Sequence, residues 1–139
     1  MKNKFNSLTD YIFQKKQNKN KIAIIFNEKK FSYNYLEKKI NAVANFFLKN
    51  GIKQNSKIGI VLPNSLEIIY CYLAASKIGA TVVPLNSNYN YKTIIFNFKR
   101  LKTDFIIGWF KFIQYLITNN NNLKYKKKKL ISVGKKIKK

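Results

Sequence analysis

The sequence predicts an α/β fold in which a partial parallel βαβ sheet is covered by helices and preceded by a small β-hairpin. Three observations lead to this prediction. The segment Lys57–Leu85 has the order strand, helix, strand, which is typical of a right-handed βαβ unit. Its two apolar runs, Lys57–Leu62 and Thr81–Leu85, do not alternate with polar residues, as expected of strands buried on both faces. A further apolar run, Asp104–Gly108, predicts that the unit repeats.

A short helix is predicted near the start of the chain. Ser7 can cap its first turn, and Asp10 follows at the spacing of a capping box, which is a common signal of a helix N-terminus. Leu8, Tyr11 and Ile12 would form its apolar face.

A β-hairpin and an amphipathic helix are predicted next. Lys21–Phe26 and Lys30–Tyr33 flank the short loop Asn27-Glu28-Lys29, and this pattern indicates a hairpin. The following helix ends at Gly51, which suits the left-handed position after a helix. Its apolar stripe at helical spacing consists of Leu36, Ile40, Val43, Ala44, Phe47 and Leu48.

Two further helices are predicted between the strands of the sheet. Pro63 ends the first strand, Asn64 is the expected cap of the next helix, and Glu67 stands in its first turn. Gly79 ends that helix. The second helix is predicted at Tyr91–Leu101.

The pattern weakens after Gly108. Phe112–Ile117 is compatible with a helix and Leu130–Val133 with one more strand. The lysine runs Lys126–Lys129 and Lys135–Lys139 are expected to be solvated or disordered. We therefore expect two regions, a scaffold formed by residues 1–108 and a Lys/Asn-rich, partly disordered tail formed by residues 109–139.

The chain of 139 residues is strongly basic, with a formal net charge of +23. Such a charge makes nucleic acid and anionic lipid the obvious classes of partner, with nonspecific polyanion binding through the Lys-rich tail. However, Arg100 is the only arginine, although arginine is the residue that clamps phosphate with two parallel hydrogen bonds. Lys, Asn, Ile, Phe and Tyr share A/T-rich codons, so a biased genome also explains this composition.

The chemically reactive side chains are few. The chain has no histidine, and Cys71, its one cysteine, falls within an apolar helix, where a buried and unreactive thiol is expected. Disulfides within one chain and Cys/His metal sites are therefore excluded. The five glycines are scattered singly, whereas phosphate-binding loops need several within a short span.

All five carboxylates have a structural explanation in the sequence. Asp10, Glu37 and Glu67 follow a Ser or Asn by three residues, which places them at the positive ends of helices. Glu28 lies in the hairpin loop and Asp104 precedes a strand. We therefore predict no catalytic residue, no metal ligand and no cofactor-binding residue from the residue types alone.

No membrane segment is expected. The first 20 residues lack the apolar region of a secretory signal. The apolar stretch Phe105–Ile117 carries Lys111 and is shorter than the roughly 20 residues that a spanning helix needs. We expect a cytoplasmic protein.

An ordered series of motifs resembles the N-terminal part of the adenylate-forming, or acyl-activating, superfamily, and most of all its acyl-CoA synthetases. FSYNYL (Phe31–Leu36) is similar to the family's Thr-Tyr-x-Glu-Leu, and NGI (Asn50–Ile52) ends the amphipathic helix. IGIVLPNSLEIIYCYLAASKIGATVVPLN (Ile58–Asn86) resembles the family's strand, Leu-Pro-Asn, helix, Lys-x-Gly-Ala and Val-Pro-Leu. DFIIG (Asp104–Gly108) and LISVG (Leu130–Gly134) are similar to later strands.

The sequence departs from the family pattern at two turns. Tyr35 stands where the family usually has Glu, so the Ser-x-x-Glu capping box is lost, and Asn34 with Glu37 offers a shifted substitute. Asn55-Ser56 replaces the usual Gly-Asp turn, and Asn tolerates the left-handed geometry that such a turn needs.

The resemblance implies an incomplete N-terminal part of an adenylate-forming enzyme fold. ATP, Mg and coenzyme A are the cofactors implied for the intact family, but its phosphate loop and catalytic Lys region have no counterpart in these residues. In acyl-CoA synthetases the loop after Val-Pro-Leu can border the channel of the thiol donor. In this chain that loop is Asn86, Ser87 and Asn88, and a plain turn that caps the next helix is the alternative interpretation.

Three functional hypotheses follow. The first is a truncated or split acyl-activating enzyme, inactive alone, with a second chain that supplies the rest. The second is a nonenzymatic basic module that binds nucleic acid or anionic lipid through the tail. The third is a decayed relic, whose unfinished sheet would expose apolar edges and aggregate.

Overall fold

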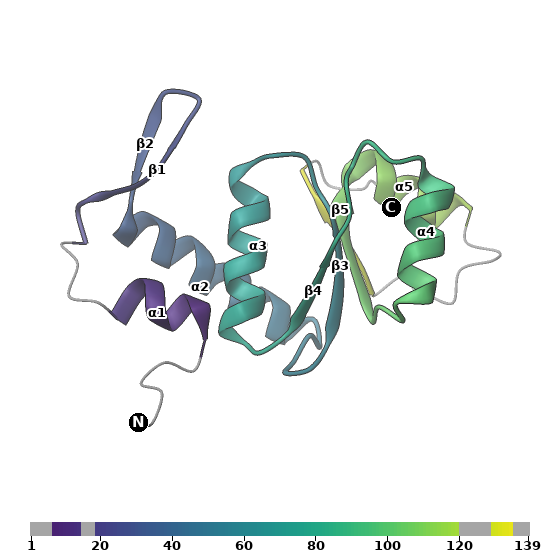
Figure 1. Ribbon diagram of the computed structural model, residues 1–139, viewed down its shortest axis with the longest axis horizontal. Coiled ribbons are helices and arrows are strands. Elements are labelled where there is room, and N and C mark those ends of the chain that lie inside the picture. Colours follow the sequence, from purple (N-terminus) through teal and green to yellow (C-terminus); the bar gives the residue numbers. More distant parts are fainter. Residues whose placement is uncertain (1–6, 15–18, 120–128, 135–139) are drawn as a thin grey trace. The chain divides into compact units, whose positions relative to one another are not determined.

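The computed structural model describes residues 7–14, 19–119 and 129–134, which form five helices and six strands (Figure 1). The chain forms two compact units, Met1–Gln54 with Ser65–Ala80, and Asn55–Asn64 with Thr81–Lys139. The elements of the first unit are α1 (Leu8–Gln14), β1 (Ile22–Phe26), β2 (Lys29–Ser32), α2 (Tyr33–Lys49) and α3 (Leu66–Lys77). Those of the second are β3 (Lys57–Val61), β4 (Thr81–Pro84), α4 (Tyr91–Arg100), β5 (Phe105–Trp109), α5 (Phe110–Thr118) and β6 (Leu130–Val133).

The predicted hairpin is confirmed, with a tighter loop than expected. β1 and β2 pair antiparallel with Phe26 opposite Lys29, so only Asn27 and Glu28 lie between the strands. Both residues have positive φ angles, 46° and 63°, as in the primed turns that match the twist of a two-residue hairpin. The expected three-residue loop is wrong by one residue, because Lys29 already belongs to β2.

The cap of α2 differs from the predicted one. Ser32 has extended backbone angles, and its Oγ accepts a hydrogen bond of 3.2 Å from the N–H of Tyr35. The shifted cap expected at Asn34 and Glu37 is therefore wrong, because the original serine still satisfies the first turn without a Glu partner. Glu37 instead pairs with Lys19, with 3.4 Å between Oε2 and Nζ.

The core side of α2 largely follows the predicted stripe. Its buried residues are Leu36, Ile40, Ala44 and Phe47. Leu48, which was predicted to widen the stripe, is exposed, because it lies on the flank of the helix away from the other four. Gly51 ends the helix with a φ of 83°, as predicted.

α1 has the predicted cap but a different inner face. The N–H of Asp10 donates to Ser7 Oγ over 3.0 Å. Leu8 and Tyr11 are exposed, and Thr9 is buried instead, where its Oγ1 donates a 2.6 Å hydrogen bond to the carbonyl of Leu73 in α3. The apolar face predicted for this helix is therefore wrong, because a tertiary hydrogen bond sets its rotation.

α3 begins one residue later than predicted. Ser65, not Asn64, is the N-cap, and its side chain makes no capping hydrogen bond. Glu67 lies in the first turn as expected, where a carboxylate is favourable next to the helix dipole. Gly79 follows the helix with a φ of 71°.

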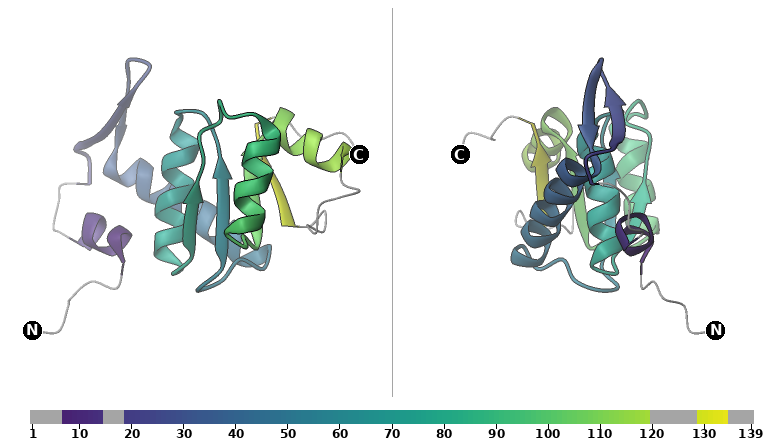
Figure 2. Two further views of the ribbon diagram at one scale, coloured as in Figure 1. Left: turned by 45° about the vertical axis from the view of Figure 1, so that its right-hand side comes forward. Right: turned by 90° about the vertical axis from the view of Figure 1, so that its left-hand side faces the viewer.

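The second unit contains a four-stranded parallel sheet in the order β4-β3-β5-β6 (Figure 2). The central strands β3 and β5 are almost entirely buried, as the lack of alternation predicted. β4 is an edge strand with exposed Thr81 and Pro84 and half-buried Val82 and Val83. The prediction that β4 is buried on both faces is therefore wrong.

Helices α4 and α5 cover one face of this sheet (Figure 2). Two glycines let the helices approach closely. A Cβ atom on Gly59 would lie 2.6 Å from Cε1 of Phe98 in α4, and one on Gly108 would lie 2.7 Å from Cδ1 of Phe112 in α5. The core on this face consists of Val61, Ile94, Phe98, Ile106, Phe112, Ile113 and Leu116.

The segment after Gly108 contains the two elements that the sequence predicted, α5 and β6. β6 pairs with β5 in parallel, with Ser132 opposite Gly108. Most of the lysine-rich stretches, residues 126–128 and 135–139, lie outside the described residues. The division into residues 1–108 and 109–139 stays a prediction. No helix within the described ranges is both long and apolar enough to cross a membrane.

Candidate functional site

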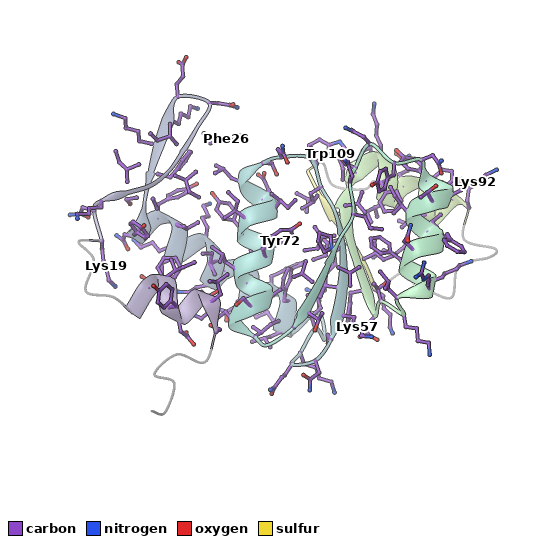
Figure 3. All side chains as sticks on the ribbon, viewed as in Figure 1. Lys19, Phe26, Lys57, Tyr72, Lys92 and Trp109 are labelled. Carbon is purple, nitrogen blue, oxygen red and sulfur yellow. The ribbon has the colours of Figure 1, made fainter. Side chains whose placement is uncertain are left out.

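The carboxyl ends of the four parallel strands form the edge at which an α/β sheet usually binds its ligand. The chain passes from β3 to β4 on one side and then crosses to β5 on the other side of β3. The ligand position expected in such a sheet is therefore between the carboxyl ends of β3 and β5. β3 continues into Pro63-Asn64, and β5 ends at Trp109. Figure 3 shows Trp109 at one end of the sheet and Lys57, at the start of β3, at the other.

The three residues predicted from the resemblance, Asn86, Ser87 and Asn88, lie at this edge, in the loop that joins β4 to α4. Oδ1 of Asn86 accepts a 2.9 Å hydrogen bond from the N–H of Asn88. The Asn86 carbonyl accepts another from the N–H of Tyr89 over 3.2 Å. The loop is therefore a turn held by the Asn86 side chain, with the side chain of Asn88 exposed and Ser87 half-buried.

The cap of α4 is Asn90, a residue that the sequence analysis did not single out. Its Oδ1 accepts a 2.8 Å hydrogen bond from the N–H of Thr93. The expectation that Asn86, Ser87 and Asn88 cap this helix is therefore wrong, although they do form a turn. Asn immediately before Tyr91 is a cap signal, but three asparagines within five residues made it ambiguous.

Trp109 is the second residue at this edge that sequence reasoning missed. It ends β5 and is the N-cap residue of α5. Its side chain keeps 43% of its surface exposed, and a Cβ atom on Gly134 would lie 3.5 Å from two atoms of its ring. The apolar run that predicts the strand ends at Gly108, and apart from the rarity of tryptophan nothing in the sequence distinguishes Trp109.

The five carboxylates have the structural surroundings that the sequence suggested, or close substitutes for them. Oδ2 of Asp104 accepts a 2.8 Å hydrogen bond from the N–H of Lys57, and the Lys57 carbonyl accepts one of 2.7 Å from the N–H of Asp104. This pair ties the start of β3 to the start of β5, at the amino end of the sheet. Glu28 lies in the hairpin turn, while Asp10 and Glu67 lie in first turns of helices.

Burial keeps the possible nucleophiles and bases of α3 protonated. It raises the pKa of the buried Cys71 thiol to about 12, with a smaller contribution from the Glu67 charge. It also raises the pKa of Tyr70 to about 12, together with a hydrogen bond to Tyr35. Because the thiolate is the reactive form, Cys71 is not a nucleophile near neutral pH.

Within the ranges that the structure describes, no three His, Cys, Asp or Glu side chains gather where they could hold a metal ion. Glu28 stands in a turn, Asp10 and Glu67 at helix starts and Asp104 at the amino end of the sheet, while Glu37 pairs with Lys19. The carboxyl edge of the sheet therefore presents polar loop residues. The described residues do not bring a general base, a nucleophile and an anion-binding site together at one point.

The sequence model of the family described as "AMP-binding enzyme" matches residues 13–138, nearly the whole chain. Among curated proteins, the crotonobetaine/carnitine–CoA ligase of Proteus mirabilis is 32% identical over 92 residues. This alignment covers 63% of the chain and 18% of the ligase. The chain therefore spans less than a fifth of the length of this relative.

Two solved structures are similar in fold. MatB from Rhodopseudomonas palustris matches with a TM-score of 0.81 and 19% identity over 93% of this chain and 25% of its own. The N-terminal subdomain of NpsA from Klebsiella oxytoca, in complex with 3-hydroxybenzoyl-AMSN, matches with a TM-score of 0.73 and 22% identity over 92% of this chain and 30% of its own.

Proposed function

Because the chain belongs to the family of AMP-binding enzymes, we propose that it supplies the N-terminal scaffold of an acyl-activating ligase. Such an enzyme joins a carboxylic acid to the α-phosphate of ATP, releases pyrophosphate and passes the acyl group to a thiol such as coenzyme A. The match over residues 13–138 is the observation that carries this proposal. The likeness to a named CoA ligase supports the choice of thiol.

We propose further that the chain does not catalyse this reaction alone. A triphosphate is held by main-chain N–H groups of a glycine-rich loop, and the five glycines of this chain stand far apart. Those of β3 and β5, Gly59 and Gly108, face aromatic rings of the helices instead. Among the described residues, no three carboxylates gather where they could hold a metal ion.

The loop of Asn86, Ser87 and Asn88 would line the path of the thiol donor in the assembled enzyme. Its position at the carboxyl edge of the sheet supports this role. The exposed Asn88 side chain is available for a hydrogen bond with a polar ligand, whereas Asn86 is engaged in holding the turn.

The experiment that tests the proposal measures pyrophosphate release with a panel of carboxylic acids. The purified chain should release none. Adding a polypeptide that carries the remaining part of an AMP-binding enzyme should restore acid-dependent release. Turnover by the chain alone would refute the proposed dependence, and failure of every complementing polypeptide would refute the scaffold role.

The alternative of a basic module depends on the Lys-rich tail, whose lysine runs lie mostly outside the described residues. Deletion of the whole segment from Phe112 onward would also remove buried Phe112, Ile113 and Leu116. The sharper test removes only residues 135–139 and then measures polyanion binding as a function of salt.

A further inference from the structure

The outer side of α4 combines cations with an exposed aromatic ring. Lys92, Phe96 and Arg100 are four residues apart, so they lie on successive turns along one side of the helix. All three are exposed, and Phe96, at 64%, is the most exposed large apolar side chain among the described residues. Figure 3 shows Lys92 directed away from the sheet.

The rotation of α4 is fixed by its opposite side. Ile94 and Phe98 are completely buried in the core over the sheet, and the ring of Phe98 lies against Gly59. A small rotation of the helix therefore cannot bury Phe96. Its exposure therefore follows from the way α4 packs on the sheet.

The charge around Phe96 is positive. The helix carries no acidic residue, and its last turn contains Lys99 and Arg100. The nearest carboxylate along the chain, Asp104, accepts the N–H of Lys57. Arg100 is also the only arginine of the chain, so the codon bias that explains the abundance of lysine does not explain this residue.

An exposed ring flanked by cations fits the surface of an anionic bilayer. The ring can enter the boundary between headgroups and acyl chains while Lys and Arg reach the lipid phosphates. Tyr89, just before α4, and Leu101, just after it, add exposed apolar surface at its two ends. Single-stranded nucleic acid would instead favour a longer row of aromatic rings for successive bases, and this surface exposes two, Phe96 on α4 and Tyr89 before it.

We propose that the outer face of α4, formed by Lys92, Phe96 and Arg100, attaches the protein reversibly to membranes that contain anionic phospholipid. This attachment is independent of the ligase proposal, because it needs neither ATP nor a second chain. Each cation contributes about fivefold to membrane partitioning. The ring of Phe96 contributes about tenfold when part of its surface leaves water.

The test measures co-sedimentation of the full chain with vesicles of phosphatidylcholine alone and of phosphatidylcholine mixed with phosphatidylserine. The double variant K92Q/R100Q should lower partitioning onto the mixed vesicles about 25-fold, and F96Q about tenfold. Matched controls lie on α2, where Lys38 and Lys49 are exposed and Phe46 is 46% exposed. K38Q/K49Q removes the same charge, and F46Q removes the same ring. Each control should change partitioning less than about twofold.

Several results would overturn the proposal. Equal losses in the α4 and α2 double variants would mean that the net charge, and not this face, drives binding. Equal binding to neutral and mixed vesicles would exclude lipid phosphate as the ligand. A loss of binding to single-stranded polyuridine, with vesicle binding unchanged in the α4 variants, would assign the face to nucleic acid. Circular dichroism of each variant verifies that the helices remain folded.

Discussion

At the scale of single residues, the glycines have packing roles that the sequence did not reveal. Their spacing excluded a phosphate loop, but it did not say what Gly59 and Gly108 are for. In the structure both stand where a helix side chain crosses a central strand. Such a role depends on a partner far along the chain, Phe98 or Phe112, so only the folded structure identifies it.

Gly59→Ala should destabilise the protein. The new Cβ would lie 2.6 Å from Cε1 of Phe98, and Phe98 is completely buried. Overpacking of this kind typically costs about 1–3 kcal/mol, which urea denaturation measures directly as a fall in the free energy of unfolding.

The double variant G59A/F98L provides the control. The smaller leucine should recover part of the loss, since it opens space beside the new methyl group. If G59A unfolds at the same urea concentration as the unmodified chain, then α4 does not pack on β3 as described.

Cys71 should be unreactive toward a thiol-specific disulfide reagent in the folded protein at neutral pH. Burial raises its pKa to about 12, whereas an unfolded chain ionises its thiol near 8.5. Stability from this group is therefore fully present below about pH 8.5 and is lost as the pH rises toward 12. The measurement is the rate of thiol modification with and without denaturant.

The variant C71A separates this effect from that of the neighbouring Tyr70, whose pKa is also raised to about 12. It should make the loss of stability above about pH 8.5 less steep. Rapid modification of native Cys71 at neutral pH would contradict its burial.

At the scale of elements, the sequence patterns predicted every helix and strand of the described ranges, and the errors concern the helix caps, the inner face of α1, the exposure of Leu48 and the burial of β4. The predicted caps Asn34 and Asn64 were displaced by Ser32 and Ser65. In a sequence so rich in Asn, several neighbouring residues satisfy the cap pattern equally well. The choice between them is made by the direction in which the chain enters the helix, which local sequence does not encode.

Asp104→Ala should weaken the junction between β3 and β5. The variant loses the acceptor of the 2.8 Å hydrogen bond from the Lys57 N–H, and such a bond contributes about 0.5–1.5 kcal/mol. Urea denaturation should show a loss of this size. Asp104→Asn keeps an acceptor oxygen, so its free energy of unfolding should fall less. Equal stability of the unmodified chain and both variants would contradict the described contact.

Asn90→Ala should destabilise α4 by about 1 kcal/mol, the usual value for removal of an N-cap side chain. Asn90 Oδ1 accepts the Thr93 N–H in the first turn. Asn88 in the same loop supplies the control, because the contact described for it uses its main-chain N–H. N88A should leave the thermal unfolding midpoint nearly unchanged, and an equal effect of the two variants would disprove the assignment of the cap.

At the scale of the whole molecule, the sequence predicted a parallel βαβ sheet but not the position of each strand within it. β4 has the apolar run of a central strand, yet it forms an edge. A central strand pairs with another strand on both sides, whereas an edge strand pairs on one side only. The residues of the strand itself do not determine which of the two it becomes. The candidate loop Asn86-Ser87-Asn88 was identified only through the family resemblance, since asparagines in a turn carry no signal of a ligand.

The proposed need for a second chain rests above all on the lack of a main-chain cradle for a triphosphate in this chain. Equilibrium binding of ATP with magnesium to the purified chain, at physiological ionic strength and with inorganic triphosphate as a competitor, tests it directly. We predict only weak, salt-sensitive binding that triphosphate competes away completely, as expected for a charge of +23. Tight, saturable binding of ATP that triphosphate fails to displace would contradict the account.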